Sequence, residues 1–147
     1  GVTNQLKSFE SEGEYSNNSS DVHAIINIDG ILDFTHPGES AKDTALDKPS
    51  VGKLWLGYSY QENPELWVEA SPLTYINEIT PPVLFINSDI ERFHAGRDEA
   101  IRILNKNNIY NEVHTIQNSP HTFWLFHPWF NEVNDIIVNF LSAVFNR

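Results

Sequence analysis

The run Val83–Ser88 constrains the fold of this chain more than any other stretch of its sequence. It is apolar at consecutive positions and rich in β-branched and aromatic residues, a pattern typical of a strand that is covered on both faces. A similar run, Val22–Ile28, ends at Asp29-Gly30, and a third strand is indicated over Glu112–Ile116. Because strands covered on both faces belong to parallel sheets, we expect a parallel sheet.

Helical patterns alternate with these strands along the chain. Asn63-Pro64 supplies a capping residue and a first-turn proline for a helix that continues to Ala70. Apolar stripes predict two further helices, over Ala95–Asn107 and Trp129–Phe145. This alternation favours an α/β fold with a parallel sheet flanked by helices, formed by one domain over residues 1–147.

Two segments of the domain do not follow this pattern. Residues 1–21 form a polar lead-in, rich in Asn, Ser and Glu, and residues 36–63 are predicted to be an irregular insertion. The insertion contains breakers at Pro37, Gly38, Pro49, Gly52 and Gly57. We expect its aromatic residues, Trp55 among them, to pack over a pocket.

The composition excludes several classes of function. The formal net charge is −11 at pH 7, which argues against nucleic acid or an anionic membrane surface as a partner. No apolar run approaches the roughly 18–20 residues that span a bilayer. The absence of Cys excludes disulfide frameworks and thiol catalysis. The histidines lack metal-ligand spacing and no glycine-rich phosphate loop occurs, so we expect neither a metal nor a cofactor.

His121 is the candidate general base of the sequence. It directly follows Asn118-Ser119-Pro120, a strong turn signal, so it is held on a loop after the third predicted strand. A histidine in such a position is well placed for proton transfer, although a surface histidine without a task has the same local sequence. The aromatic residues between Phe123 and Phe130 either line a sugar or aryl pocket or pack in the core, and we favour packing.

Six segments of the sequence resemble segments of a known family. Three segments look like the C-terminal half of an α/β-hydrolase: Ser71–Ile76, Pro81–Asn87 and Ser119–His121. Three others resemble a branch of bacterial carbohydrate esterases: Ile28–Phe34, Arg92–Asp98 and His121–Trp129. Those enzymes are secreted, are related to acetylxylan, pectin and feruloyl esterases, and are also described as lipase- or xylanase-like. The resemblance covers roughly residues 20–146 and implies a secreted or periplasmic location.

The resemblance implies two catalytic residues in this chain. His121 matches the catalytic histidine on the loop after the last strand, where it serves as general base and then general acid. The acid partner is expected in the loop after the preceding strand, and we predict Asp98 because its segment most resembles the esterase branch. Glu91, Asp89 and, less strongly, Asp33 are alternatives; each of the four acids is otherwise read as a solvated loop charge or a helix cap.

The nucleophile of this family has no match in the chain. A Gly-x-Ser-x-Gly turn is required to present the serine, and none occurs. Gly57-Tyr58-Ser59 begins such a pattern but the second glycine is absent, so we treat Ser59 as a decoy. The oxyanion-hole loop is also missing. We therefore expect a processed, excised or truncated second half of an enzyme, whose Val22–Ile28 edge pairs with the N-terminal half of the same hydrolase or with a second copy.

Two hypotheses of function follow. In the first, the chain supplies the histidine and acid of a Ser-His-Asp/Glu triad to a serine esterase that hydrolyses acyl esters of polysaccharides such as xylan or pectin, and is inactive alone. In the second, it is a non-catalytic binding or structural module that keeps the hydrolase architecture.

Overall fold

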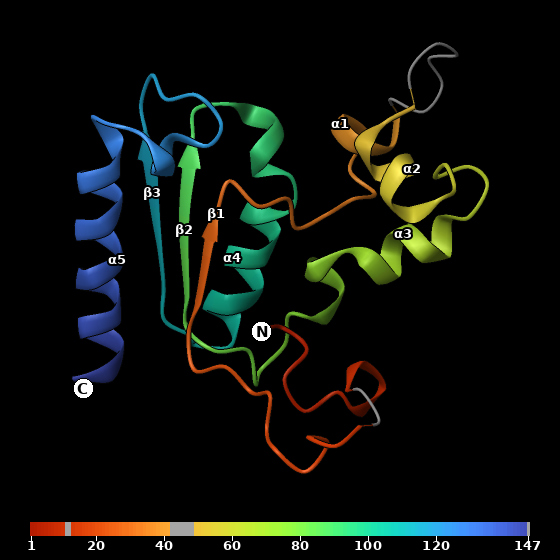
Figure 1. Cartoon of the computed structure of the whole chain (residues 1–147), viewed down its shortest axis with the longest axis horizontal. Coiled ribbons are helices and arrows are strands. Elements are labelled where there is room, and N and C mark those ends of the chain that lie inside the picture. The colour runs from red at the N-terminus through yellow and green to blue at the C-terminus, as the bar shows by residue number, and fades with distance from the viewer. Residues whose placement is uncertain (11–12, 42–48, 147) are drawn as a thin grey trace.

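The computed structural model of the chain describes residues 1–10, 13–41 and 49–146. Its centre is a parallel sheet of three strands in the order β1-β2-β3, formed by Ile25–Ile28, Val83–Ser88 and Asn111–Ile116 (Figure 1). The prediction of an α/β fold with parallel strands is therefore confirmed. All three strands end at the same edge of the sheet, which is where the loops that follow them meet.

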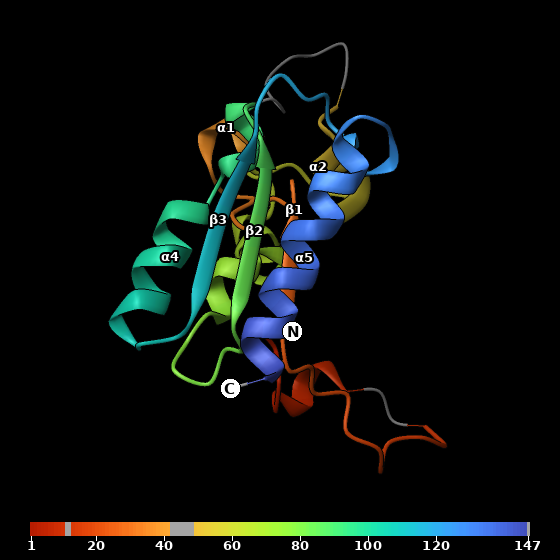
Figure 2. The ribbon, with the colours of Figure 1, turned by 90° about the vertical axis from the view of Figure 1, so that its left-hand side faces the viewer.

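Strand β2 is the centre of two hydrophobic clusters, one on each face of the sheet. Val83 and Phe85 pack with helix α4, Arg97–Lys106, whereas Leu84 and Ile86 pack with helix α5, Trp129–Phe145. Figure 2 shows the two helices on opposite sides of the strands. Because successive side chains of a strand point to opposite faces, six consecutive buried residues require cover on both sides.

Three short helices follow β1 and stand apart from the sheet at one side of the molecule (Figure 1). They are α1, Pro37–Ser40; α2, Val51–Leu56; and α3, Pro64–Ala70. Helix α3 begins as predicted, because the Asn63 side chain accepts a hydrogen bond from the Leu66 N–H at 3.2 Å.

The predicted irregularity of residues 36–63 is wrong for the part that forms α1 and α2. Pro37 occupies the first turn of α1, and Gly57 ends α2 in the left-handed conformation with φ 82°. At the start of α2 the Ser50 hydroxyl accepts a hydrogen bond from the Lys53 N–H. The residues that read as breakers are therefore start and stop signals of short helices. Residues 42–48 of the predicted insertion lie outside the described residues.

Short 3-10 helices complete the fold. They are η1, Lys7–Phe9; η3, Pro72–Tyr75; η4, Glu91–His94; and η5, Phe123–Leu125. The polar lead-in, apart from residues 11–12, is described. A pair of hydrogen bonds joins the Asn4 side chain to the backbone of Val22, in the segment that leads into β1. Within the part of the chain that the structure describes, no helix has the length and apolar character needed to cross a membrane.

Candidate active site

Asp29 lies at the carboxyl end of β1 and is held there by the neighbouring strand. Its backbone N–H donates to the Ile86 carbonyl at 2.9 Å, and its Oδ1 accepts a hydrogen bond from the Ser88 N–H at 2.6 Å. The residue is only 3 % exposed. A carboxylate that accepts a backbone N–H in a buried position has little rotational freedom, so its second oxygen points in a fixed direction.

The turn that follows Asp29 depends on a side-chain clamp. Asp29 has φ 48°, in the left-handed region, and Gly30 comes directly after it. The Asn27 side chain accepts from the Gly30 N–H at 2.9 Å and donates to the Gly30 carbonyl at 3.1 Å. A Cβ at Gly30 would lie 2.7 Å from Asn27 Nδ2, so this position favours glycine.

His121 comes from the loop after β3 and meets Asp29 across the carboxyl edge of the sheet. Its Nδ1 lies 3.2 Å from Asp29 Oδ2. The loop is anchored on both sides of its turn: the Ser119 hydroxyl donates to the Ile116 carbonyl at 2.7 Å, and the Asn118 N–H donates to Asp89 Oδ2 at 3.2 Å. The Asp29 side chain is fully buried, whereas the His121 side chain is 44 % exposed.

Two aromatic rings fix the plane of the His121 imidazole. The Phe93 ring stacks on it with a centroid distance of 4.1 Å and an interplanar angle of 11°. The Trp124 ring meets it edge-on, at 5.3 Å and 81°. In the aromatic run, Phe123 is fully buried in the core, as the packing interpretation expected, while Trp124 borders the histidine.

The resulting arrangement has the geometry of an oriented general base. A buried carboxylate that accepts the Nδ1–H selects the tautomer with the lone pair on Nε2 and stabilises the imidazolium that forms after proton uptake. The aromatic contacts restrict rotation of the ring. The pair can therefore accept a proton from a nucleophile and return it to a leaving group.

Asp98, the predicted acid partner, is not brought to His121. Its side chain is 81 % exposed and forms an ion pair with Arg97, whose Nη2 lies 2.8 Å from Asp98 Oδ1. It occupies the first turn of α4, where a carboxylate favours the N-terminus of the helix. The structure thus places Asp98 in a surface ion pair and gives the contact with His121 to Asp29.

The three alternative acids also lie elsewhere. Asp89 accepts the Asn118 N–H and so braces the histidine loop from outside. Asp33 accepts hydrogen bonds from the backbone and hydroxyl of Thr35, within its own turn. Glu91 is exposed in the first turn of η4. Two of the three therefore stabilise loops close to the sheet edge.

Ser59 has a structural task in this chain. It is 6 % exposed, and its hydroxyl accepts a hydrogen bond from the Glu62 N–H at 3.3 Å. Glu62 returns the contact by accepting from the Ser59 N–H at 2.7 Å, which gives the turn before α3 the reciprocal hydrogen bonds of a capping box. Hydrogen bonds from the Ser59 backbone and hydroxyl, followed by Lys53, lower the pKa of Glu62 to about 2. This arrangement agrees with the treatment of Ser59 as a decoy.

From the sequence we chose Asp98 as the acid and weighed only one acid after β1, Asp33, which lies four positions beyond the residue that contacts His121. Asp33 was weighed after β1, whereas Asp29 read only as the polar end of a strand. The available signal was its position: a carboxylate directly after a run predicted to be a parallel strand lies at the sheet edge where ligands of α/β proteins bind.

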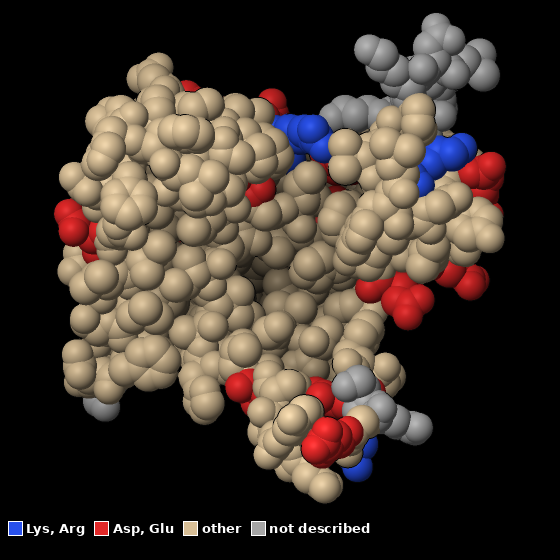
Figure 3. All heavy atoms as spheres, in the orientation of Figure 1, with Lys and Arg blue, Asp and Glu red and all other residues tan. Residues whose placement is uncertain are grey.

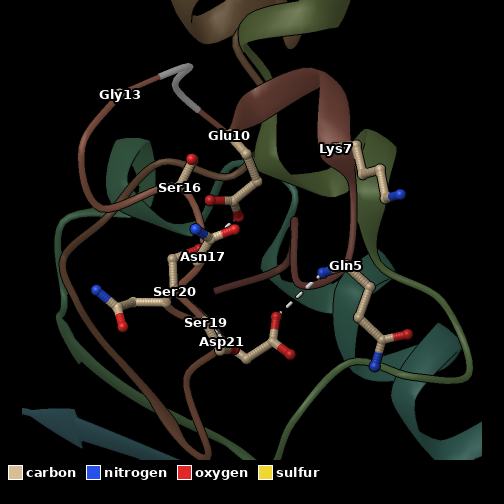
Figure 4. A pocket seen from close by; sticks show the side chains of 10 residues that line it. Gln5, Lys7, Glu10, Gly13, Ser16, Asn17, Ser19, Ser20 and Asp21 are labelled. Carbon is tan, nitrogen blue, oxygen red and sulfur yellow. Dashed lines mark hydrogen bonds between the residues drawn. The ribbon is translucent and has the colours of Figure 1, made fainter.

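Two cavities among the described residues are lined by neither Asp29 nor His121. One of about 610 Å³ is bordered by polar side chains of the lead-in, and Figure 4 shows Gln5, Glu10, Ser20 and Asp21 around it. Its contacts, such as the Gln5 N–H to Asp21 at 3.1 Å, hold the lead-in together. The other, of about 320 Å³, is lined mainly by apolar side chains next to η4. Among the described residues, no three His, Asp or Glu side chains are grouped so as to hold a metal ion.

The parallel sheet with helices on both faces is the architecture of an α/β-hydrolase domain. The chain belongs to the BD-FAE family, whose model matches residues 1–112. The match ends before His121, so the family assignment and the histidine contact are separate observations.

Two solved structures share the fold. One, described as a truncated form of a carbohydrate esterase from gut microbiota, has a TM-score of 0.63 and 16 % identity, and the match covers 95 % of this chain and 53 % of that one. The other is a thermophilic esterase, Est2, of the planctomycete Thermogutta terrifontis with butyrate bound, with a TM-score of 0.62, 16 % identity and coverage of 93 % and 49 %. The chain thus spans about half the length of these structures. No curated protein sequence matches the chain.

Proposed function

We propose that this chain supplies the histidine and acid of a Ser-His-Asp triad to a serine esterase that acts on acyl esters of polysaccharides. The observation that carries the proposal is the contact between the buried Asp29 carboxylate and His121 at the carboxyl edge of the sheet. Membership of the BD-FAE family and a fold shared with a carbohydrate esterase support the reaction class and the substrate class. The family resemblance also supports secretion or a periplasmic location.

The proposed reaction begins with a serine that lies outside this chain. With Nδ1–H donating to Asp29, His121 Nε2 takes the proton of the serine hydroxyl as its oxygen attacks the ester carbonyl. The tetrahedral intermediate collapses when the imidazolium returns that proton to the leaving alcohol, which leaves an acyl-enzyme. Water, deprotonated by the same Nε2, then attacks the acyl carbonyl. The imidazolium returns that proton to the serine oxygen as the bond to the acyl group breaks, which releases the acid and the free serine.

A nucleophile outside the chain requires a partner, and we propose the N-terminal half of the same hydrolase. Strand β1 supports this choice, because it pairs with β2 on one side and its four residues are only half-buried. A further parallel strand beside β1 would bring its own carboxyl end next to Asp29. A second copy of the chain is the alternative occupant of this edge. Sedimentation and thermal unfolding of the isolated chain test the proposal. A monodisperse monomer that unfolds cooperatively would contradict it.

The triad is tested by hydrolysis of p-nitrophenyl acetate by the complete protein. His121→Ala is expected to lower kcat on the order of 10⁶-fold, as for loss of the base in a serine hydrolase. The complete protein should also be inactivated by a serine-directed phosphonofluoridate. Unchanged turnover in His121→Ala would refute the triad, and a complete protein without turnover would favour the non-catalytic module.

The isolated 147-residue chain provides the second half of this test. It is expected to show no turnover. In the segment Gly57-Tyr58-Ser59, the hydroxyl and N–H of Ser59 are both hydrogen-bonded to Glu62. Inhibitor-sensitive turnover by the isolated chain would instead place a nucleophile within it.

A further inference from the structure

A cavity of about 320 Å³ lies between the loop after β1, helices α1 and α2, and η4. Its walls are apolar and include Phe34, Val51 and Trp55, and its polar end carries Arg92 and Glu39. Figure 3 shows the surface hollowed where the body that contains the sheet meets the helices α1 and α2. The cavity thus lies on the same side of the molecule as the loops that follow the carboxyl ends of the strands.

The cavity is connected to the Asp29–His121 pair through one aromatic ring. The guanidinium carbon of Arg92 lies 5.5 Å from the centroid of the Phe93 ring, and that ring stacks on the imidazole of His121. A group bound against Arg92 is therefore held one ring away from the proposed general base.

The apolar walls present flat, exposed surfaces. The Trp55 side chain is 66 % exposed, and its ring lies 5.5 Å from that of Phe34 at an angle of 44°. Val51, one turn earlier on α2, is 69 % exposed. Large apolar side chains left exposed on one rim mark a binding surface, and an indole face suits the C–H face of a ring.

The polar end of the cavity is an ion pair whose charge is already compensated. Arg92 donates through Nε and Nη2 to the two oxygens of Glu39, the second at 2.9 Å, and Glu39 is only 4 % exposed. The hydrogen bond that Arg92 donates to Glu39 raises the pKa of Arg92, so the guanidinium stays charged at all ordinary pH values. A guanidinium has five N–H donors, and two are directed to Glu39.

The apolar wall with Trp55 and the Arg92–Glu39 ion pair favour a neutral sugar ring over the other parts of a polysaccharide ester. An acyl chain would desolvate the ion pair without a compensating hydrogen bond. A uronate would meet an arginine already neutralised by Glu39 on a chain with a net charge of −11. A neutral pyranose offers an apolar face to Trp55 and hydroxyl groups to the Arg92–Glu39 pair.

We propose that this cavity is a subsite for a neutral sugar of the substrate, with Trp55 as its stacking platform and Arg92–Glu39 as its hydroxyl-binding end. The proposal rests on the proposed esterase function, but sugar binding is measured without turnover. Failure of the subsite and failure of the triad are therefore distinguishable.

Calorimetric titration of the complete protein with xylotetraose tests the subsite. Trp55→Ala is expected to weaken binding by about tenfold or more, the size of a lost aromatic contact. Leu54→Ala is the matched control, because Leu54 is 70 % exposed on the same helix and is not among the residues that line the cavity. Trp55→Phe, which keeps a flat ring, should recover most of the affinity and excludes a general loss of folding.

The opposite results overturn the proposal. If Trp55→Ala and wild type bound xylotetraose with equal affinity, or if wild type did not bind it, the cavity would not be a sugar subsite. Tighter binding of tetragalacturonate than of xylotetraose would contradict the preference for a neutral ring. In turnover, Trp55→Ala should lower the ratio of kcat/KM for acetylated xylo-oligosaccharide to that for p-nitrophenyl acetate. If Trp55→Ala lowered kcat/KM only for esters with longer acyl chains, the cavity would be an acyl pocket instead.

Discussion

The loops after β1 and β2 leave the same edge of one sheet, yet they use their carboxylates differently. After β1, Asp29 is buried, accepts the Ser88 N–H and contacts His121. After β2, Asp98 pairs with Arg97 at the surface and Asp89 accepts a backbone N–H from the histidine loop. Three acids that follow two neighbouring strands thus differ in burial and in the groups that orient them.

The environment of a carboxylate, rather than its presence in a matching segment, therefore determines whether it can orient an imidazole. A surface ion pair such as Arg97–Asp98, in which the carboxylate is 81 % exposed, contributes about 0–1 kcal/mol and holds the carboxylate only weakly. A buried carboxylate with one oxygen fixed by a backbone N–H offers the other in a single direction. Asp29 meets this condition and Asp98 does not.

Substitution of Asp29 gives the largest expected effect on this comparison. Asp29→Asn keeps the size of the side chain but removes its charge. The amide can also hydrogen-bond to either tautomer of His121, so it no longer selects the one that leaves Nε2 free to accept a proton. We expect kcat for p-nitrophenyl acetate in the complete protein to fall on the order of 10⁴-fold, as for loss of the acid in other triads.

Asp98→Asn is the matched control, because it makes the same chemical change at the exposed acid. Its kcat is expected to remain within about twofold of wild type, since the lost surface ion pair is worth little. A large fall in Asp98→Asn together with normal turnover in Asp29→Asn would reverse the comparison and return the role to the loop after β2.

Phe93→Leu is expected to have an intermediate effect on the same histidine. Leucine fills most of the volume but offers no flat face to the imidazole, so the ring that stacks at 4.1 Å loses one restraint on its orientation. We expect kcat to fall by about tenfold, with a smaller change in KM. Phe145→Leu, at the exposed end of α5, serves as the control. An equal change in both variants would show that Phe93 does not position His121.

The fold was predictable because its signals are local and agree with one another. Val83–Ile86 are apolar at consecutive positions, and the observed strand buries them on both of its faces. The helix Trp129–Phe145 has the predicted bounds, because its apolar stripe matches the face that covers β2.

The site was harder to predict because it joins residues that are far apart in the sequence. Asp29 and His121 are 92 positions apart, and nothing in the local sequence of Asp29 records the Ser88 N–H that holds it. Asp98 was favoured because a matching segment was easier to recognise than a burial environment. In the segment 36–63, short helices were missed because Pro37 and Gly57 read as breakers instead of caps.

Glu62 extends the comparison to an exposed carboxylate that, like Asp29, accepts a backbone N–H. The Ser59 N–H and hydroxyl, and then Lys53, lower the pKa of Glu62 from 4.5 to about 2. A carboxyl whose pKa is lower in the folded state contributes stability above pH 4.5, and this contribution is lost as the pH falls toward 2.

The expected consequence is a pH-dependent difference between wild type and Glu62→Gln. Glutamine cannot ionise, so the variant should melt at a lower temperature than wild type at pH 6, and the difference should shrink progressively as the pH is lowered below 4.5. The effect should be the smallest of the set, because the group is exposed and screened by salt. Thermal unfolding of both proteins, followed by circular dichroism from pH 6 to pH 2.5, measures it. A difference in melting temperature that is constant over this range would show that the ionised carboxylate of Glu62 does not stabilise the capping box. Asp29 and Glu62 both accept a hydrogen bond from a backbone N–H, so burial would then be the property that distinguishes Asp29.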